Sequence, residues 1–223
     1  ADLTATPTAN NFGSFFYDNT EEFNMEQVGF TGETEIVAPS FVNYVEGIYV
    51  GYRFWETAAA EGLINYDESV VYPFGYGLSY TTFTQEMGEM TESDGTISFD
   101  VTVTNTGDVA GKDVVEVYYN PPYTNGGIEK ATANLIAFEK TEMLEPGASE
   151  TVTITFNAED MASYDYQNAL AYVLEAGDYE ISINSDSHTV IDSQTYNVPE
   201  TITYSGHNRR STDQAQVTNQ FAT

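Results

Sequence analysis

Between residues 83 and 198 hydrophobic and polar side chains alternate in short runs, the pattern of antiparallel strands that bury one face. In the clearest run, residues 97–104, Ile, Phe and Val alternate with Ser, Asp and Thr. In residues 151–156, Thr alternates with Val, Ile and Phe. The strands predicted in this way are 83–90, 97–104, 114–119, 135–141, 151–156, 170–174, 179–183 and 188–198.

Turn sequences separate these runs. Ser-Asp-Gly at 93–95, a segment with two glycines at 105–111 and Glu-Pro-Gly at 145–147 each predict a reversal of the chain. Residues 175–178 are predicted to join strands 170–174 and 179–183 in a hairpin. A short helical turn is expected at 158–163, with Asn157 as its N-cap.

About seven or eight short strands, with a turn every 8 to 14 residues or so, predict an all-β fold. We expect an immunoglobulin-like or fibronectin type III-like antiparallel β-sandwich of two sheets. The sequence shows no alternation of strands and helices that would indicate a parallel sheet.

The segments on either side of the sandwich lack this regularity. Residues 1–40 have no clean period and are rich in Thr, Asn, Gly and Phe, which indicates an aromatic-rich arm or a piece of a larger domain. A helical turn is expected at 58–62, with Gly62 ending it. We divide the chain into an irregular arm (1–80), the sandwich (81–200) and a polar linker (201–223).

The arm ends in the run YPFGYGLSY at residues 72–80, which we call the elbow. Three aromatic side chains alternate there with small residues, and Pro73 restricts the backbone at the entry. Gly75 and Gly77 allow a positive φ or a close approach of the backbone to another group. We expect a rigid elbow, extended and buried, that connects the arm to the sandwich.

Composition narrows the classes of function. The chain has 223 residues, with 35 acidic and 6 basic side chains and a formal charge of −29. This balance argues against binding nucleic acid or an anionic membrane, because each phosphate contact requires Lys or Arg. The chain has no cysteine and no apolar run near the roughly 20 residues that span a bilayer. No signal peptide is visible, and cytoplasmic and secreted locations both stay open.

Five blocks of sequence, in order, carry a family resemblance: 44–57 (YVEGIYVGYRFWET), 72–83 (YPFGYGLSYTTF), 101–124 (VTVTNTGDVAGKDVVEVYYNPPYT), 136–156 (IAFEKTEMLEPGASETVTITF) and 172–187 (YVLEAGDYEISINSDS). Together they resemble the end of the α/β sandwich domain and the fibronectin type III-like domain of glycoside hydrolase family 3, the β-glucosidase family. The polar tail is similar to the lead into a catalytic barrel, which follows this domain in some members.

The resemblance implies retaining hydrolysis of β-glycosides by a larger enzyme. Members use an Asp nucleophile on a barrel and, in many cases, a Glu acid/base on the α/β sandwich domain, and this sequence matches neither motif. We therefore expect a non-catalytic structural module, inactive alone. Its expected partners are the barrel and α/β sandwich domains of the same enzyme, with a β-glucoside or oligosaccharide as the substrate of the whole.

Three residues are candidates for the wall of a substrate site in that larger enzyme: Glu46, Arg53 and Trp55. Arg53 could hold a sugar hydroxyl or a carboxylate, or instead form an internal pair with a glutamate. Trp55 could stack on a pyranose ring, or it could be a packed aromatic residue.

Five aromatic residues are candidates for docking against other domains: Tyr72, Phe74, Tyr76, Tyr80 and Tyr123. Tyr123 belongs to the loop 121–130, the best candidate for an exposed contact with a ligand or a domain. The alternative function is a self-standing carbohydrate- or surface-binding sandwich, in which Trp55 and Tyr123 would form a stacking platform.

The sequence gives little support for a catalytic carboxylate pair or a metal site. Acidic residues on strands, including Asp100, Glu116 and Glu180, are expected to face solvent, and Glu159 and Asp160 to be solvated or to favour a helix N-terminus. His188 and His207 lack the spacing of a metal site, and residues 184–186 lack the frame of a calcium loop. We expect no metal site and no cofactor.

Overall fold

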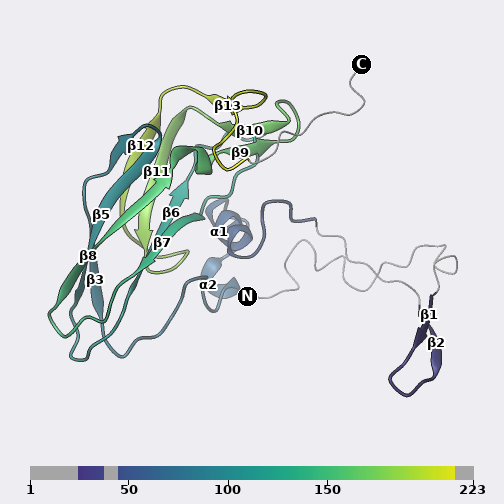
Figure 1. Ribbon diagram of the computed structural model, residues 1–223, viewed down its shortest axis with the longest axis horizontal. Helices are drawn as coiled ribbons and strands as arrows, with labels where there is room; N and C mark the ends of the chain where they lie inside the picture. Colours follow the sequence, from purple (N-terminus) through teal and green to yellow (C-terminus); the bar gives the residue numbers. More distant parts are fainter. Residues whose placement is uncertain (1–24, 38–44, 214–223) are drawn as a thin grey trace.

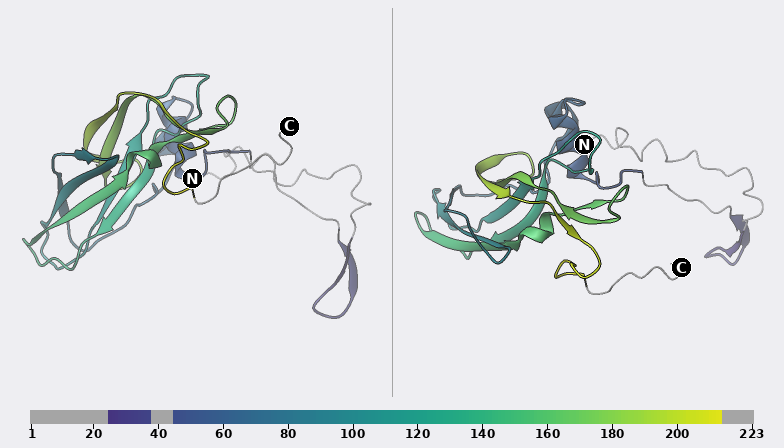
Figure 2. Two further views of the ribbon diagram at one scale, coloured as in Figure 1. Left: turned by 45° about the horizontal axis from the view of Figure 1, so that its top comes forward. Right: turned by 90° about the horizontal axis from the view of Figure 1, so that it is seen from above.

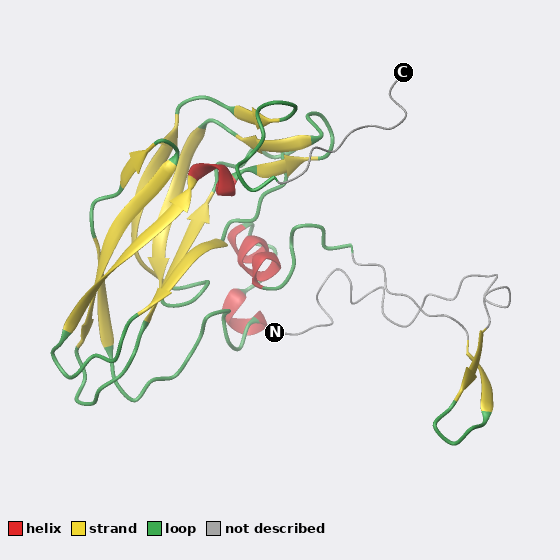
Figure 3. Ribbon diagram, viewed as in Figure 1, coloured by secondary structure: helices red, strands yellow, loops and turns green. Residues whose placement is uncertain are grey.

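The computed structural model describes residues 25–37 and 45–213, and within them the all-β prediction is confirmed. The first sheet has β5 (Thr96–Asn105) at its centre, β8 (Ser149–Asn157) along one side and, along the other, β3 (Phe83–Met87) followed by β4 (Thr91–Ser93). The second sheet has the order β12 (Val190–Val198), β11 (Gly177–Asn184), β6 (Val114–Asn120), β7 (Asn134–Lys140), and every pairing is antiparallel. Figures 1 and 3 show these long strands side by side.

The core lies between the two sheets. Val101 and Val103 of β5 are fully buried, as are Val117 of β6 and Ile181 and Ile183 of β11. The alternation of β5 is as predicted, because its Ser, Asp and Thr positions face away from this core. Burial of such side chains is the main favourable term in the folding of a sandwich of this size.

A third, three-stranded sheet contradicts the predicted hairpin at 175–178. β10 (Ala171–Leu174) pairs with β9 (Ser163–Asp165) and β13 (Ile202–Tyr204), and not with β11. The turn sequence indicated that the chain reverses, but it did not say which strand becomes the partner. Burial of two successive residues, Val173 and Leu174, marks β10 as covered on both faces, unlike a strand in a half-exposed hairpin.

Two other local predictions differ from the structure. The helical turn at 158–163 is found as the 3₁₀ helix η4 (Ala158–Met161), but Asn157 makes no capping hydrogen bond with its side chain. Asn157 is the last residue of β8, and its amide oxygen accepts a hydrogen bond from the hydroxyl of Thr96, its partner on β5, at 3.3 Å. The cross-strand position therefore takes the side chain away from the helix.

Residues 25–37 form a hairpin of β1 (Met25–Val28) and β2 (Thr34–Val37) in a stretch for which no strand was predicted. Four residues are too few for a period to stand out. The rest of the predicted arm, 1–24 and 38–44, lies outside the described residues, as does 214–223 of the predicted linker.

The helices precede the sandwich. Helix α1 (Tyr52–Ala60) begins six residues before the predicted helical turn, and Gly62 follows its end with a φ of +69°. Helix α2 (Tyr66–Ser69) comes next. Figure 2 shows these helices outside the sandwich, and a hydrogen bond from Leu135 N–H to the Tyr52 hydroxyl places α1 against β7.

The beginning of the predicted linker is attached to the domain. The guanidinium carbon of Arg210 lies 3.5 Å from the centre of the Tyr172 ring, and Arg210 pairs with Asp213 at 3.1 Å. Ser211 donates hydrogen bonds from its N–H and its hydroxyl to Glu159 of η4. Across residues 25–37 and 45–213, no helix is long and apolar enough to cross a membrane.

Candidate functional site

The aromatic side chains of the elbow are exposed, which contradicts the prediction that the elbow is buried. The exposed fractions are 68% for Tyr72, 48% for Phe74, 47% for Tyr76 and 102% for Tyr80, and Leu78 adds 89%. Apolar residues in such number normally indicate a buried segment, and this was the basis of the prediction. The chain instead fixes the backbone of the elbow and leaves its rings about half exposed or more.

Ring contacts connect the elbow to the second sheet. The ring of Phe74 stacks on that of Tyr52 in α1, with centroids 4.7 Å apart and planes at 18°. Tyr52 in turn meets Tyr118 of β6 edge-on at 6.1 Å. The N–H of Ser187 donates to the carbonyl oxygen of Phe74 at 2.8 Å. These contacts come from α1, β6 and the loop after β11, so the elbow has a defined position on the sandwich.

Gly75 allows a close approach at the centre of the elbow. Its φ is +87°, and a Cβ at this position would overlap the carboxylate of Glu116. Glu116 is half-buried on β6 and accepts a hydrogen bond from the Tyr118 hydroxyl at 2.7 Å. Burial raises the pKa of this carboxyl group. The prediction that Glu116 faces solvent was wrong, because the elbow covers this part of the outer face of the sheet.

A buried carboxylate fastens α1 to the loop between β11 and β12. Glu56 is 7% exposed and accepts hydrogen bonds from the hydroxyls of Tyr66 (2.6 Å) and Ser187 (2.8 Å). Its other oxygen lies 2.8 Å from Nδ1 of His188, and the His188 and Tyr66 rings stack at 3.7 Å. We call these four residues the Glu56 cluster.

The Glu56 cluster is suited to holding segments together. Burial and the neighbouring Glu56 raise the pKa of Tyr66, so that its phenol stays a hydrogen-bond donor. Asp186 positions the loop by accepting hydrogen bonds from the backbone of His188 (2.9 Å) and Thr189 (2.8 Å). The buried Glu56 carboxylate already accepts hydrogen bonds from the cluster, so its hydrogen-bonding capacity is well satisfied. Glu56 and Ser187 lie 131 residues apart, so no local sequence pattern could have revealed the cluster.

The loop 121–130, predicted as an exposed contact, packs against the segment around α1. The Tyr49 hydroxyl donates to Glu129, and just after the loop the N–H of Thr132 donates to the Thr57 hydroxyl at 3.1 Å. Lys130 is 5% exposed and donates to the Pro122 carbonyl oxygen at 2.6 Å. Tyr123 remains 42% exposed and lines a pocket of about 170 Å³ with Tyr49.

The three residues predicted for a substrate wall lie before or on α1, and their role stays a prediction. Trp55 is 6% exposed and meets Phe54 edge-on at 5.1 Å, which is the packed arrangement named as its alternative. Arg53 lies 5.9 Å from the centre of the Tyr52 ring and forms no ion pair with a carboxylate of the described residues. Glu46 is half-buried. Burial of Trp55 removes one ring from the stacking platform of the alternative function.

Metal chemistry has no candidate in the described segments, where no three His, Asp or Glu side chains gather as ligands would. His188 is engaged by Glu56.

Comparison with known proteins gives one family-model match and many relatives. The model described as a fibronectin type III-like domain matches residues 113–187. The chain is 40% identical over 163 residues to β-glucosidase A of Butyrivibrio fibrisolvens, covering 65% of this chain and 19% of that protein. It is 42% identical over 147 residues to a β-glucosidase of Ruminococcus albus, covering 64% of this chain and 14% of that protein.

The similar solved structures are also β-glucosidases. β-Glucosidase 3B of Thermotoga neapolitana, in complex with glucose, is 37% identical with a TM-score of 0.64, and the match covers 76% of this chain and 22% of that one. A GH3 β-glucosidase of Bifidobacterium adolescentis is 25% identical with a TM-score of 0.62, covering 91% of this chain and 26% of that one. The chain thus spans about a fifth of the length of the first relatives that it matches.

Proposed function

We propose that this chain, which carries the fibronectin type III-like part of glycoside hydrolase family 3, is a non-catalytic module. It buttresses the catalytic domains of a larger β-glucosidase-like enzyme. The relatives contain other domains, since the match covers 14–26% of their length. The module docks on such domains through the elbow, with Tyr72, Phe74, Tyr76 and Tyr80 as its main contacts.

The observation that carries this proposal is that the elbow is ordered and exposed at once. Large apolar side chains grouped in one exposed segment indicate an interaction surface. The stacking of Phe74 on Tyr52 and the hydrogen bond from Ser187 hold the elbow in one shape before a partner arrives. A surface that is already rigid loses little conformational entropy on docking.

The carboxylates support the non-catalytic part of the proposal. Retaining hydrolysis needs two carboxyl groups about 5 to 5.5 Å apart beside a sugar-binding cleft. Glu56, the buried acid of α1, is occupied by the hydroxyls of Tyr66 and Ser187 and by His188. Glu116 lies beneath Gly75 of the elbow and accepts from Tyr118. Both acids hold structural contacts.

Hydrolysis by the isolated chain tests this part. We expect no release of nitrophenol from an aryl β-glucoside or the matching β-xyloside above the rate without protein. A preparation of a family 3 β-glucosidase is the positive control. Turnover that survives repurification and disappears on substitution of an acidic residue of this chain would overturn the proposal.

A further inference from the structure

A second pocket, lined by none of the elbow residues, opens at the end of the sandwich beside the three-stranded sheet. Its volume is about 560 Å³, within the range of roughly 300–1,000 Å³ usual for small-molecule sites. Its lining comes from five parts of the fold: β4 with the β4–β5 turn, the end of β8 with η4, the end of β10, β12, and β13 with the loop before it. Ser211, near the end of the described residues, also lines it.

The floor of this pocket is apolar. Leu174, Val198 and Ala158 are at most 6% exposed and form the end of the core. Ile202 adds an apolar side chain that is 39% exposed. An apolar floor of this kind favours a ligand with a hydrophobic face over one that is charged all round.

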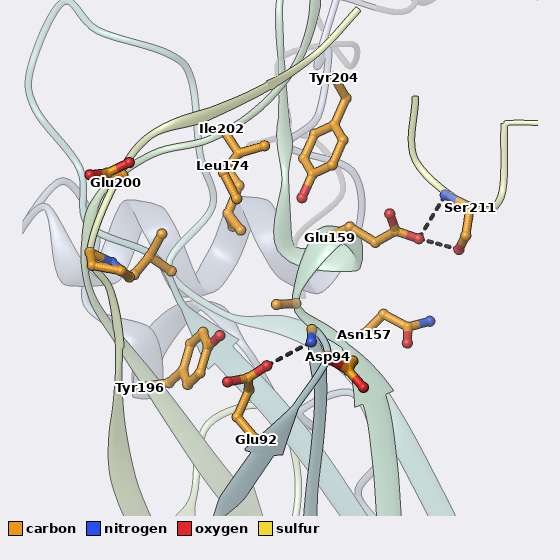
Figure 4. A pocket seen from close by; sticks show the side chains of 14 residues that line it. Glu92, Asp94, Asn157, Glu159, Leu174, Tyr196, Glu200, Ile202, Tyr204 and Ser211 are labelled. Carbon is orange, nitrogen blue, oxygen red and sulfur yellow. Dashed lines mark hydrogen bonds between the residues drawn. The ribbon is translucent and has the colours of Figure 1, made fainter. Parts of the chain in front are cut away.

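Two tyrosines face each other across the pocket. Figure 4 shows Tyr196 and Tyr204 on opposite sides, with both phenol hydroxyls directed toward the middle. Burial and nearby carboxylates raise the pKa of both phenols, so that they stay protonated donors. Each tyrosine therefore offers a flat apolar ring and one hydrogen-bonding group at the same place.

Acceptors complete the lining. The side chains of Asn157, Asp94 and Glu200 line the pocket, and Glu92 and Glu159 bring further carboxylates. Glu92 accepts a hydrogen bond from the Gly95 N–H at 2.6 Å, and Glu159 accepts from Ser211. Each carboxylate can accept more than these bonds, so acceptors for several hydroxyl groups surround an apolar floor.

The acidic residues by themselves do not select a cation. Acids are 35 of 223 residues, so any pocket of this chain contains several of them. Glu92 and Glu159 are already stabilised by hydrogen bonds from the chain. What distinguishes this pocket is the combination of apolar floor, tyrosine rings and acceptors, and that combination matches the alternating CH and OH groups of a pyranose.

We infer that this pocket binds a short neutral oligosaccharide, with the pyranose ring against Tyr196 and Tyr204 and its hydroxyls donating to Asn157 and the surrounding carboxylates. Such a site would hold a carbohydrate chain near the enzyme that carries the module. The inference does not depend on docking through the elbow, and either can fail without the other.

Calorimetric titration of the full chain with cellotriose and with xylotriose tests the inference. We expect saturable binding of at least one of them, in the millimolar range or tighter. Tyr196→Ala should weaken it about tenfold or more, and Tyr204→Phe, which keeps the ring and removes the hydroxyl, should weaken it severalfold. The matched control is Tyr166→Ala, since Tyr166 is 60% exposed and lies outside the lining. Its effect should be less than about twofold.

Three results would overturn the inference. One is the absence of binding to both sugars at about 10 mM, which corresponds to a free energy too small for a built site. Another is that Tyr196→Ala and Tyr166→Ala weaken sugar binding equally, in variants whose cooperative unfolding shows that both are folded. The third is binding of spermidine but of neither sugar, with spermidine binding weakened by Glu200→Gln, because the pocket would then select a cation through its carboxylates.

Discussion

At the scale of single residues, the position of the elbow depends on the missing side chain of Gly75. Its φ of +87° lies in the region that L-residues avoid, and the Glu116 carboxylate occupies the space where a Cβ would stand. Glu116 cannot move freely, because it accepts from Tyr118. The sequence predicted that a glycine here serves a positive φ or a close approach, and the structure shows both. It could not predict that the approaching group is Glu116, which lies 41 residues later and alternates with core residues.

Gly75→Ala should lower the free energy of unfolding by about 1–2 kcal/mol, through strain in the backbone and displacement of Glu116. Chemical denaturation at neutral pH measures the loss. Gly77→Ala is the control, since no atom lies within 4 Å of its added methyl group and its φ is not positive. Its effect should stay under about 1 kcal/mol. Equal losses from the two substitutions would show that the contact between Gly75 and Glu116 does not constrain the elbow.

At the scale of elements, periodicity predicted strands well and partners poorly. The residues of β5 and β8 alternate cleanly, and they pair along their whole length. β9 and β13 have three residues each, too short for any period, and β10 was predicted but assigned to the wrong neighbour. Helix α1 was predicted only at its end, because the aromatic residues at its start are of types enriched in strands.

The turn between β9 and β10 provides a test by pH. Hydrogen bonds from the backbone N–H groups of Asn168 and Ala169, with a further one from Gln167, hold the pKa of Asp165 below its usual 3.8. A lowered folded-state pKa contributes stability above the unfolded-state pKa, and that stability is lost as the pH falls through the folded-state value. Asp165→Asn should therefore lower the Tm at pH 7 and have progressively less effect below about pH 4.

Asp108→Asn is the control for that measurement, because Asp108 is an exposed aspartate of another turn. It should change the Tm little at either pH. If the difference between Asp165→Asn and the unsubstituted protein were as large at pH 2.5 as at pH 7, the ionised carboxylate would not be what stabilises the turn.

At the scale of the whole molecule, the sandwich follows from alternation and turns, whereas the exposure of the elbow does not. The sequence named Tyr72, Phe74, Tyr76 and Tyr80 as docking candidates but predicted a buried elbow, because apolar density alone cannot distinguish a core from an interface. Whether such residues are covered depends on domains that a single segment does not specify. The Glu56 cluster and the pocket lined by Tyr196 and Tyr204 were missed for a related reason, since each assembles residues from distant parts of the chain.

Docking through the elbow is the central claim, and a thermal unfolding measurement in two contexts tests it most directly. Residues 45–213 of this chain replace the corresponding segment of the Butyrivibrio fibrisolvens β-glucosidase A, and Tyr72→Ser with Tyr76→Ser is introduced into this chimera and into the isolated chain. The control pair is Tyr164→Ser with Tyr166→Ser, since these two tyrosines are also about half exposed or more.

We predict that the elbow pair lowers the Tm of the chimera by at least about 2 °C and that of the isolated chain by less than about 1 °C. The control pair should have a small effect in both contexts. An elbow pair that leaves the chimera unchanged, or that lowers the Tm equally in both contexts, would contradict the account, because the exposed aromatic residues would then contribute nothing to contact with the other domains.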